Sequence, residues 1–130
     1  MCFRLKPTET RFLADYRDVM KPMAQALDIL QAEKKAYMGY LLPTLTMLQE
    51  KLRARREVTQ TCGPLVDALL AGIARRFEAT MCDPESIAAA ILHPKFRKDW
   101  TDDATVLDKG KLAMFVYMYN IYILYMCNKL

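Results

Sequence analysis

Apolar residues recur at steps of three and four along most of the first 103 positions, and this spacing constrains the fold more than any other feature. Residues three and four apart share one face of an α-helix, so the spacing predicts amphipathic helices. No segment before residue 110 shows the alternation of apolar and polar residues that is typical of strands. The chain has only 4 Gly, which also disfavours a turn-rich β fold. We therefore predict an all-α fold, a helical bundle.

The first predicted helix begins near Thr8, with Thr8 or Thr10 as its N-cap, and frays around residues 33–35. Pro22 lies inside it. A proline in a helix interior removes a backbone hydrogen bond and clashes with the preceding turn, so we expect a kink near Met20. The side chains expected on its apolar face are Phe12, Tyr16, Val19, Met20, Met23, Leu27 and Leu30.

Two further helices are predicted from proline positions and apolar rows. One follows residues 37–40 and has Pro43 in its first turn, where the missing N–H is not needed. The other starts at Gly63 and Pro64 for the same reason, and we expect Arg75 and Arg76 near its end, where cations suit the helix dipole. The expected apolar rows are Leu41, Leu45, Leu48 and Leu52 on the first, and Leu65, Leu69, Ile73 and Phe77 on the second.

A short fourth helix is predicted to open at Asp83 and Pro84, because Asp is a good N-cap and proline suits the first helical position. Pro94 ends it, and residues 95–100 form a basic and aromatic turn. We assign residues 1–103 to one helical domain and residues 104–130 to a distinct tail.

The tail contains a run of 16 uncharged residues, Leu112 to Cys127, that is apolar or aromatic except for Asn120. A membrane span needs about 20 apolar residues, so the run is short for one. Three interpretations remain open. The run is a buried core helix or strand, which we favour, or a non-native end of the reading frame that is foreign to the fold, or a tail anchor.

No residue is assigned a catalytic or metal-binding role. His93 has no neighbouring partner that could orient it for catalysis, so we expect a structural role. Asp99, Asp102 and Asp103 lack the spaced ligands and glycine of a calcium loop, and we expect a solvated turn. The single serine, Ser86, is not in a nucleophile-elbow context. We expect a non-enzyme without a cofactor or a small-molecule substrate.

The four cysteines are widely scattered, and no two form a CxxC pair of the kind found in zinc sites. We therefore expect reduced thiols at Cys2, Cys62, Cys82 and Cys127, as is usual inside cells. Residues 1–7 become charged too soon to form the apolar region of a signal peptide. Together these features favour an intracellular protein.

The net charge of +4 permits contact with nucleic acid without requiring it. Basic residues gather in four short segments, one of which is Lys34–Lys35. No recognition helix, zinc finger or RNP-like pattern accompanies them, which favours solvated helix faces, and DNA contact would be non-specific. The candidate phosphate contacts are Arg53, Arg55, Arg56, Arg75, Arg76, Lys95, Arg97 and Lys98.

Several sequence blocks follow one another in a fixed order over about residues 9–101. Two of them are the most specific, Leu27-Asp28-x-Leu30-Gln31 and Leu92-x-Pro94-x-Phe96-Arg97. The others are Phe12-Leu13-x-x-Tyr16, Met20 to Ala26, Tyr40 to Leu45, Pro64 to Leu70, Arg75 to Phe77 and Ala88 to Ile91. This succession resembles the hAT superfamily of DNA transposases, including their domesticated BED-zinc-finger relatives.

The resemblance implies a helical domain of the kind inserted into the RNase H-like catalytic core of these transposases, and a nuclear location. The family's two catalytic aspartates lie upstream of this stretch. Its glutamate follows the last block, whereas the last glutamate here, Glu85, precedes that block. No catalytic residue is therefore transferred, and the resemblance implies a truncated, inactive, transposable-element-derived scaffold.

On this interpretation the protein has two possible partners. One is DNA, which it would bind weakly and without sequence preference, and the other is a protein, which its apolar helix faces would bind. A stand-alone helical protein-interaction module is the main alternative. A tail-anchored membrane protein is a third, and we do not expect membrane binding.

Overall fold

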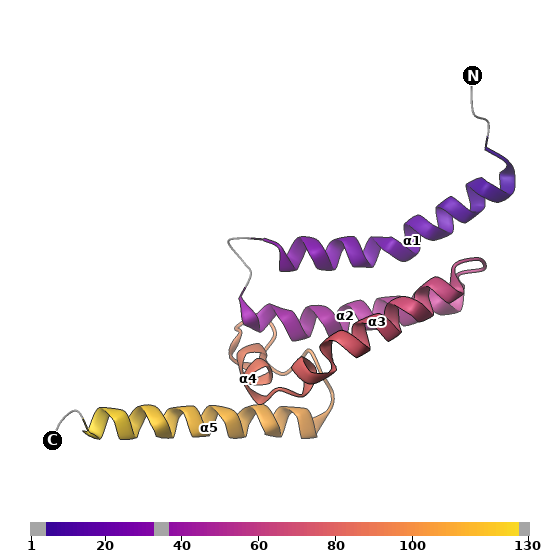
Figure 1. The fold of residues 1–130 in the computed structure, drawn as a ribbon. Coiled ribbons are helices and arrows are strands. Elements are labelled where there is room, and N and C mark those ends of the chain that lie inside the picture. Colours follow the sequence, from indigo (N-terminus) through magenta and orange to yellow (C-terminus); the bar gives the residue numbers. More distant parts are fainter. Residues whose placement is uncertain (1–4, 33–36, 128–130) are drawn as a thin grey trace. The chain divides into compact units, whose positions relative to one another are not determined.

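The computed structural model describes residues 5–32 and 37–127, and every regular element in these residues is a helix (Figure 1). The all-α prediction is confirmed. The chain divides into two compact units. The first contains α1 and most of α2 and α3; the second contains η1, the start of α2, the end of α3, α4 and α5. The elements are α1 (Pro7–Leu30), η1 (Met38–Tyr40), α2 (Leu41–Val58), α3 (Gly63–Cys82), α4 (Pro84–Leu92) and α5 (Ala104–Cys127).

Three predicted helix starts are confirmed, because short local signals fix them. Pro43 lies in the first turn of α2, and Gly63 opens α3. Asp83 caps α4, and its carboxylate accepts hydrogen bonds from the Ser86 backbone N–H at 2.9 Å and the Ser86 hydroxyl at 2.7 Å. The turn expected at residues 95–100 is also present.

α1 begins at Pro7, close to the predicted start near Thr8, but the predicted cap is wrong. Pro7 takes the first helical position, which makes Lys6 the N-cap in place of Thr8 or Thr10. The Glu9 carboxylate accepts a hydrogen bond from the Lys6 backbone N–H at 2.8 Å and so satisfies a donor at the helix start. The fraying expected around residues 33–35 lies outside the described residues.

The expected apolar face of α1 is wrong in part. The buried residues are Val19, Pro22 and Ala26, whereas Phe12 and Leu27 are 47% and 48% exposed. The buried face is therefore rotated away from the largest side chains. α1 bends part-way along its length (Figure 1), as an internal proline predicts.

The apolar row of α2 is confirmed in its central part, since Leu45, Leu48 and Leu52 are buried. On α3 the most buried residues are Val66 and Ile73. The other members of the expected α3 row, Leu65, Leu69 and Phe77, are half-buried, so the core side of α3 is turned toward Val66.

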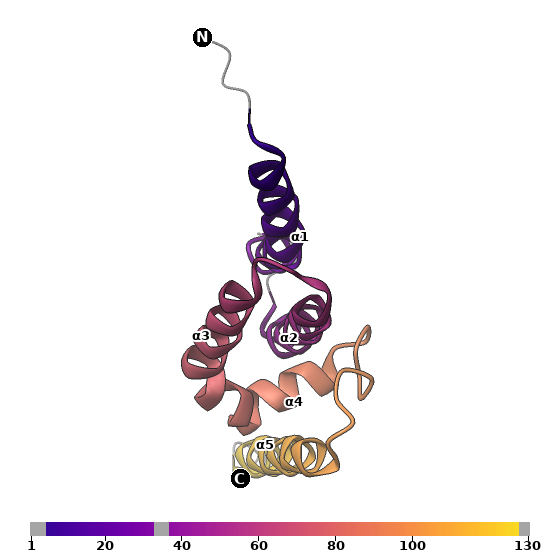
Figure 2. The ribbon, with the colours of Figure 1, turned by 90° about the vertical axis from the view of Figure 1, so that its right-hand side faces the viewer.

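The core of the second unit consists of Leu42, Ile87 and Ala90, all fully buried. α5 packs beside α4 over this core (Figure 2). The contact is close because Gly110 has no side chain. A Cβ at that position would lie 2.6 Å from Cγ2 of Ile87 and 2.7 Å from Cδ1 of Ile91. The partly buried side chains around the core are Met81, Ile91, Trp100 and Val106.

The tail forms a helix and no strand, since the uncharged run continues α5 from its start at Ala104. Asp103 precedes the helix, and its carboxylate accepts hydrogen bonds from the Thr105 backbone N–H at 2.9 Å and the Thr105 hydroxyl at 2.6 Å. An aspartate at this position stabilises the positive end of the helix. The expectation that Asp103 belongs only to a solvated turn is therefore incomplete.

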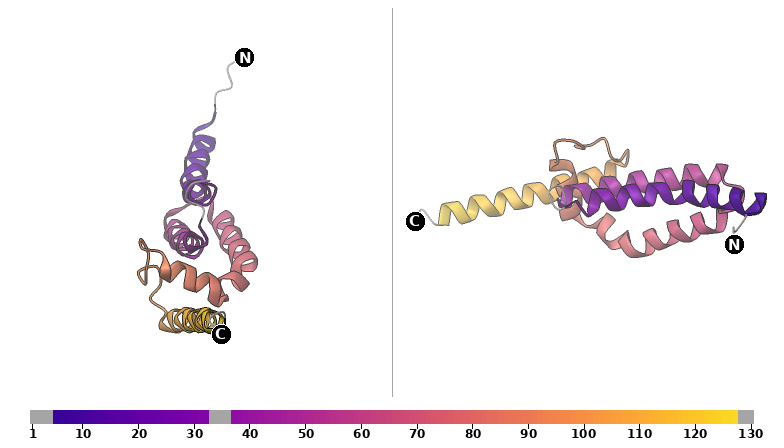
Figure 3. Two further views of the ribbon diagram at one scale, coloured as in Figure 1. Left: turned by 90° about the vertical axis from the view of Figure 1, so that its left-hand side faces the viewer. Right: turned by 90° about the horizontal axis from the view of Figure 1, so that it is seen from above.

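The interpretation of the uncharged run as buried core is wrong for most of its length. α4 has 9 residues and α5 has 24, so α4 covers only the first part of α5. From Phe115 to Met126 the large apolar side chains are between 41% and 70% exposed. The far part of α5 extends beyond α4 (Figure 3). Among the described residues, no helix is long and apolar enough to cross a membrane.

Two glycine substitutions test the close approach of α4 and α5. Gly110→Ala gains about 1 kcal/mol of helix propensity, but its methyl group would overpack the Ile87 and Ile91 side chains, which costs about 1–3 kcal/mol. We expect a lower melting temperature, measured by circular dichroism. Gly72→Ala is the control, because nothing lies within 4 Å of its added methyl group. It should stabilise the chain by about 0.5–1 kcal/mol. Equal stabilisation by both variants would contradict the packing described.

Candidate functional site

The eight candidate phosphate contacts are all exposed, but they do not form one described surface. Arg53, Arg55, Arg56, Arg75 and Arg76 belong to the first unit, and Lys95, Arg97 and Lys98 belong to the second. Lys34 and Lys35 lie outside the described residues. The surroundings of each residue therefore decide which of them can bind an anion.

The three arginines of α2 point in different directions, because successive helix residues are about 100° apart. Arg56 is engaged within the protein: its Nε lies 2.8 Å from Oδ1 of Asp67. This carboxylate raises the pKa of the Arg56 guanidinium. Arg53 is exposed on another face of the helix, and Arg55 faces α1.

Arg75 and Arg76 lie inside α3 rather than at its end. The helix continues to Cys82, so its last turn contains no basic residue. The expected stabilisation of the negative helix end by these two arginines is therefore wrong. Both side chains are exposed.

A groove between α1 and α2 gathers positive charge in the first unit. Its volume is about 400 Å³. Three of its lining residues are the cations Lys21, Lys51 and Arg55, and no lining residue is acidic. Among the described residues, none of these cations forms an ion pair. The remaining lining residues are Pro22, Gln25, Ala54 and Val58.

The groove is built from two i, i+4 pairs, because residues four apart lie on one helix face. Lys21 and Gln25 form the pair on α1, and Lys51 and Arg55 form the pair on α2. The Lys51 ammonium donates a hydrogen bond to Oε1 of Gln25 at 3.3 Å, which links the two walls. The sequence reasoning selected Arg55 but missed both lysines, which are separated by 30 positions in the sequence.

Asp15 fixes the orientation of α1 relative to the loop between α2 and α3. Its Oδ2 accepts hydrogen bonds from the Thr61 hydroxyl at 2.8 Å, from the Thr61 backbone N–H at 3.1 Å and from the Gln60 backbone N–H at 3.2 Å. The Thr59 hydroxyl contributes a fourth bond at 3.3 Å. These donors, the Thr61 hydroxyl first, lower the pKa of Asp15. Asp15, Val19, Pro22 and Ala26 share one face, so this bonding determines which side of α1 is buried.

Asp15→Asn tests this anchor. The substitution keeps the size of the side chain but removes the charge that four donors stabilise, so we expect a lower melting temperature at neutral pH. The folded pKa of Asp15 lies below the ordinary value of 3.8. Its stabilisation is therefore fully present above pH 3.8 and is lost as the pH falls through the folded pKa. The difference in melting temperature between the wild type and Asp15→Asn should become smaller in that acidic range.

Asp18→Asn is the matched control for the anchor. The Asp18 carboxylate pairs with the exposed Arg17 side chain next to it, at 3.0 Å, and exposed pairs contribute little. Melting temperatures measured across acidic and neutral pH compare the two variants. An equal decrease in melting temperature for Asp15→Asn and Asp18→Asn would show that Asp15 does not anchor α1.

Of the three candidate cations of the second unit, Lys95 lies over an aromatic cluster formed by Tyr40, His93 and Phe96. The Lys95 ammonium lies 5.8 Å from the ring centre of Tyr40 and 5.4 Å from that of Phe96. The centre of the His93 ring lies 4.4 Å from that of Tyr40 and 5.1 Å from that of Phe96. Its Nδ1 accepts a hydrogen bond from the Lys95 backbone N–H. Arg97 has a positive φ of 49°, in the left-handed region. The contacts of His93 and Lys95 are thus packing contacts.

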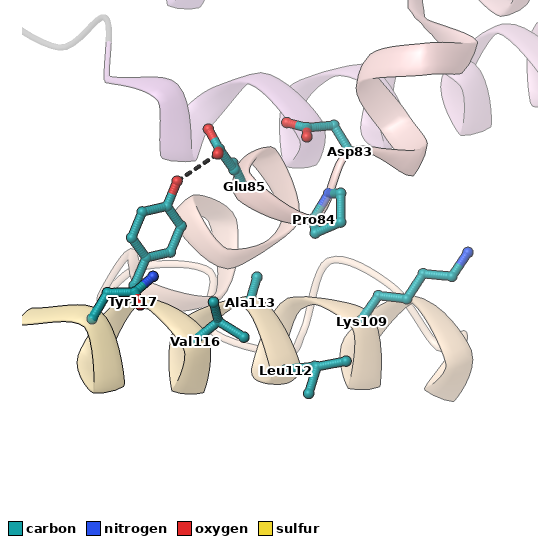
Figure 4. Close-up of a pocket in the computed structure, with 9 residues that line it drawn as sticks. Asp83, Pro84, Glu85, Lys109, Leu112, Ala113, Val116 and Tyr117 are labelled. Carbon is teal, nitrogen blue, oxygen red and sulfur yellow. Dashed lines mark hydrogen bonds between the residues drawn. The ribbon is translucent and has the colours of Figure 1, made fainter. Parts of the chain in front are cut away.

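A second groove lies between α4 and α5 and has mixed charge (Figure 4). Its volume is about 550 Å³, and its lining includes Asp83, Glu85 and Lys109. The Tyr117 hydroxyl, on α5, donates a hydrogen bond to the Glu85 carboxylate on α4, which raises the pKa of Tyr117. Two carboxylates beside one ammonium make this groove a poor site for an anion.

The described residues contain no group of three His, Cys, Asp or Glu side chains that could hold a metal ion. Asp99 and Asp102 are exposed, while Asp103 caps α5. Of the cysteines, Cys62 is buried, and Cys82 and Cys127 are exposed; all three are free thiols. Cys2 lies outside the described residues.

No family model matches the chain, and no curated protein or solved structure is similar enough to be assigned as a relative. The similarity to hAT transposases therefore stays a prediction from the residues that carry it.

Proposed function

We propose that this chain is a catalytically inactive helical scaffold of hAT-transposase origin, whose groove between α1 and α2 contacts the phosphate backbone of DNA. One observation carries the proposal: the groove places Lys21, Lys51 and Arg55 together, and no acidic residue lines it. Lysine and arginine side chains supply most of the backbone contacts in protein–DNA complexes.

The proposed contact carries no base specificity. Two of the three groove cations are lysines, whose ammonium groups on flexible stems bind phosphates as point charges, and a single arginine, Arg55, is too little to read a base sequence. The groove contains no aromatic side chain on which an unpaired base could stack. Binding should therefore be weak, independent of sequence and strongly dependent on salt.

The scaffold role, the nuclear location and the absence of catalysis rest on the family resemblance. In such transposases the corresponding helical domain supports the catalytic core and helps to position DNA. A basic groove on a non-catalytic helical unit fits that role. The remaining basic residues, including Arg53, Arg75 and Arg76, are proposed only as secondary contacts.

The alternative function is a stand-alone helical protein-interaction module. The apolar side chains exposed on α5 favour it, since such surfaces mark interaction sites. This alternative predicts binding to protein and none to DNA.

The test removes the groove charges together. In Lys21→Gln/Lys51→Gln/Arg55→Gln, the affinity for a random-sequence DNA duplex should fall, measured by fluorescence anisotropy between about 50 and 200 mM salt. The salt slope is the decrease in the logarithm of the binding constant per unit increase in the logarithm of the salt concentration. Removal of one cation that binds a phosphate should reduce this slope by about 1, so we expect a reduction of about 2–3 for the triple variant.

The matched control is Arg53→Gln/Arg75→Gln/Arg76→Gln, which lowers the net charge equally but lies outside the groove. It should change the salt slope by less than about 1. Equal losses of affinity for the two triple variants would mean that overall charge, not the groove, attracts DNA. No measurable binding by the wild-type chain at low salt would refute the proposal and favour the alternative.

A further inference from the structure

The face of α5 that lies away from α4 carries a continuous row of large apolar side chains. Gly110 packs against α4, and Tyr117 is hydrogen-bonded to it, so these two residues mark the inner face. At about 100° per residue, the positions opposite this face form a single row. The row consists of Leu112, Phe115, Tyr119, Tyr122 and Met126, which are 66%, 70%, 65%, 58% and 45% exposed. Leu112, at the start of the row, also lines the groove between α4 and α5.

The spacing of this outer row is three, four, three and four residues. That is the spacing of the a and d positions of a heptad repeat, by which two helices pack side by side. The rest of the run is also apolar, and this row is both regularly spaced and centred opposite Gly110 and Tyr117. The geometry therefore favours another helix of the same kind as the occupant of this face.

The exposed area of the row is large enough for a stable contact. An aromatic or large aliphatic side chain buries up to roughly 200 Å², so the five exposed fractions together correspond to about 600 Å². The flanking Ile123 side chain, 41% exposed, extends this toward the roughly 800 Å² that each partner buries in a stable interface. A monomer rarely exposes so large an apolar patch.

The charge distribution favours a second copy of this chain as the partner. No residue between Leu112 and Cys127 is charged, so two copies bring no like charges together. The row carries no charge that would attract a basic or an acidic partner. The identical row on a second copy supplies the same spacing and the same apolar area.

We propose that α5 is a self-association helix, and that two copies of this chain pair through Leu112, Phe115, Tyr119, Tyr122 and Met126. The inner face of each α5 stays against its own α4. This inference is independent of the DNA groove, which lies in the other unit.

Analytical ultracentrifugation of the full chain, over a range of concentrations, tests the proposal. The wild type should form a dimer that dissociates on dilution. Tyr119→Glu places a charge at the centre of the row and should raise the dimer dissociation constant by about 30-fold or more, as expected for a central interface residue. Circular dichroism establishes that the variant keeps its helical content.

Ile121→Glu is the matched control. It introduces the same charge two residues further along the same helix, at a position 65% exposed, but it lies on the side of α5 that faces α4. We expect a change in the dissociation constant of less than about 3-fold. If both variants dissociate the dimer equally, association is non-specific and the row is not the interface.

Two further outcomes would overturn the proposal. One is a wild-type chain that stays monomeric at every concentration. The other is a monomeric chain that floats with phosphatidylcholine vesicles and loses this behaviour in Tyr119→Glu, because the outer face would then bind lipid. A dimer that resists Ile121→Glu and is abolished in Tyr119→Glu would support the proposal.

Discussion

The contact between α4 and α5 at Gly110 is the constraint on which the second unit depends. A side chain at this position would overlap Ile87 and Ile91, so glycine permits α5 to close the small core around Leu42 and Ala90. The same contact determines what remains uncovered. α4 is too short to follow α5 to its end, so the inner face is packed for a few turns, whereas the large side chains of the outer face are 45–70% exposed. This exposed apolar face is the surface that we propose for self-association.

The first unit depends on a polar interaction instead. Asp15 binds the loop between α2 and α3 through four hydrogen bonds, and α1 is therefore buried along Val19, Pro22 and Ala26 rather than along its largest side chains. Small residues on the buried face leave space between α1 and α2. The Lys21–Gln25 face of α1 and the Lys51–Arg55 face of α2 line that space, which is why the charge gathers there.

The sequence predicted what short-range signals determine. Pro43, Gly63-Pro64 and Asp83-Pro84 mark helix starts because their effects act within one turn. The rotation of α1 was not predictable, since the partners of Asp15 lie 44 to 46 positions away. The groove was missed for the same reason, because its cations lie on two helices. For the uncharged run, local composition did not distinguish helix from strand, and its exposure depends on the length of α4.

Hydrogen exchange along α5, measured at low and high protein concentration, tests most directly the claim that this helix has a covered part and a self-associating part. Amides in uncovered helix exchange quickly unless a partner protects them. We expect residues 104–117 to be protected at every concentration, whereas residues 122–127 become protected only where the chain dimerises. Rapid exchange of residues 104–117 at all concentrations would contradict the packing on α4. Protection of residues 122–127 that does not change with concentration would contradict self-association.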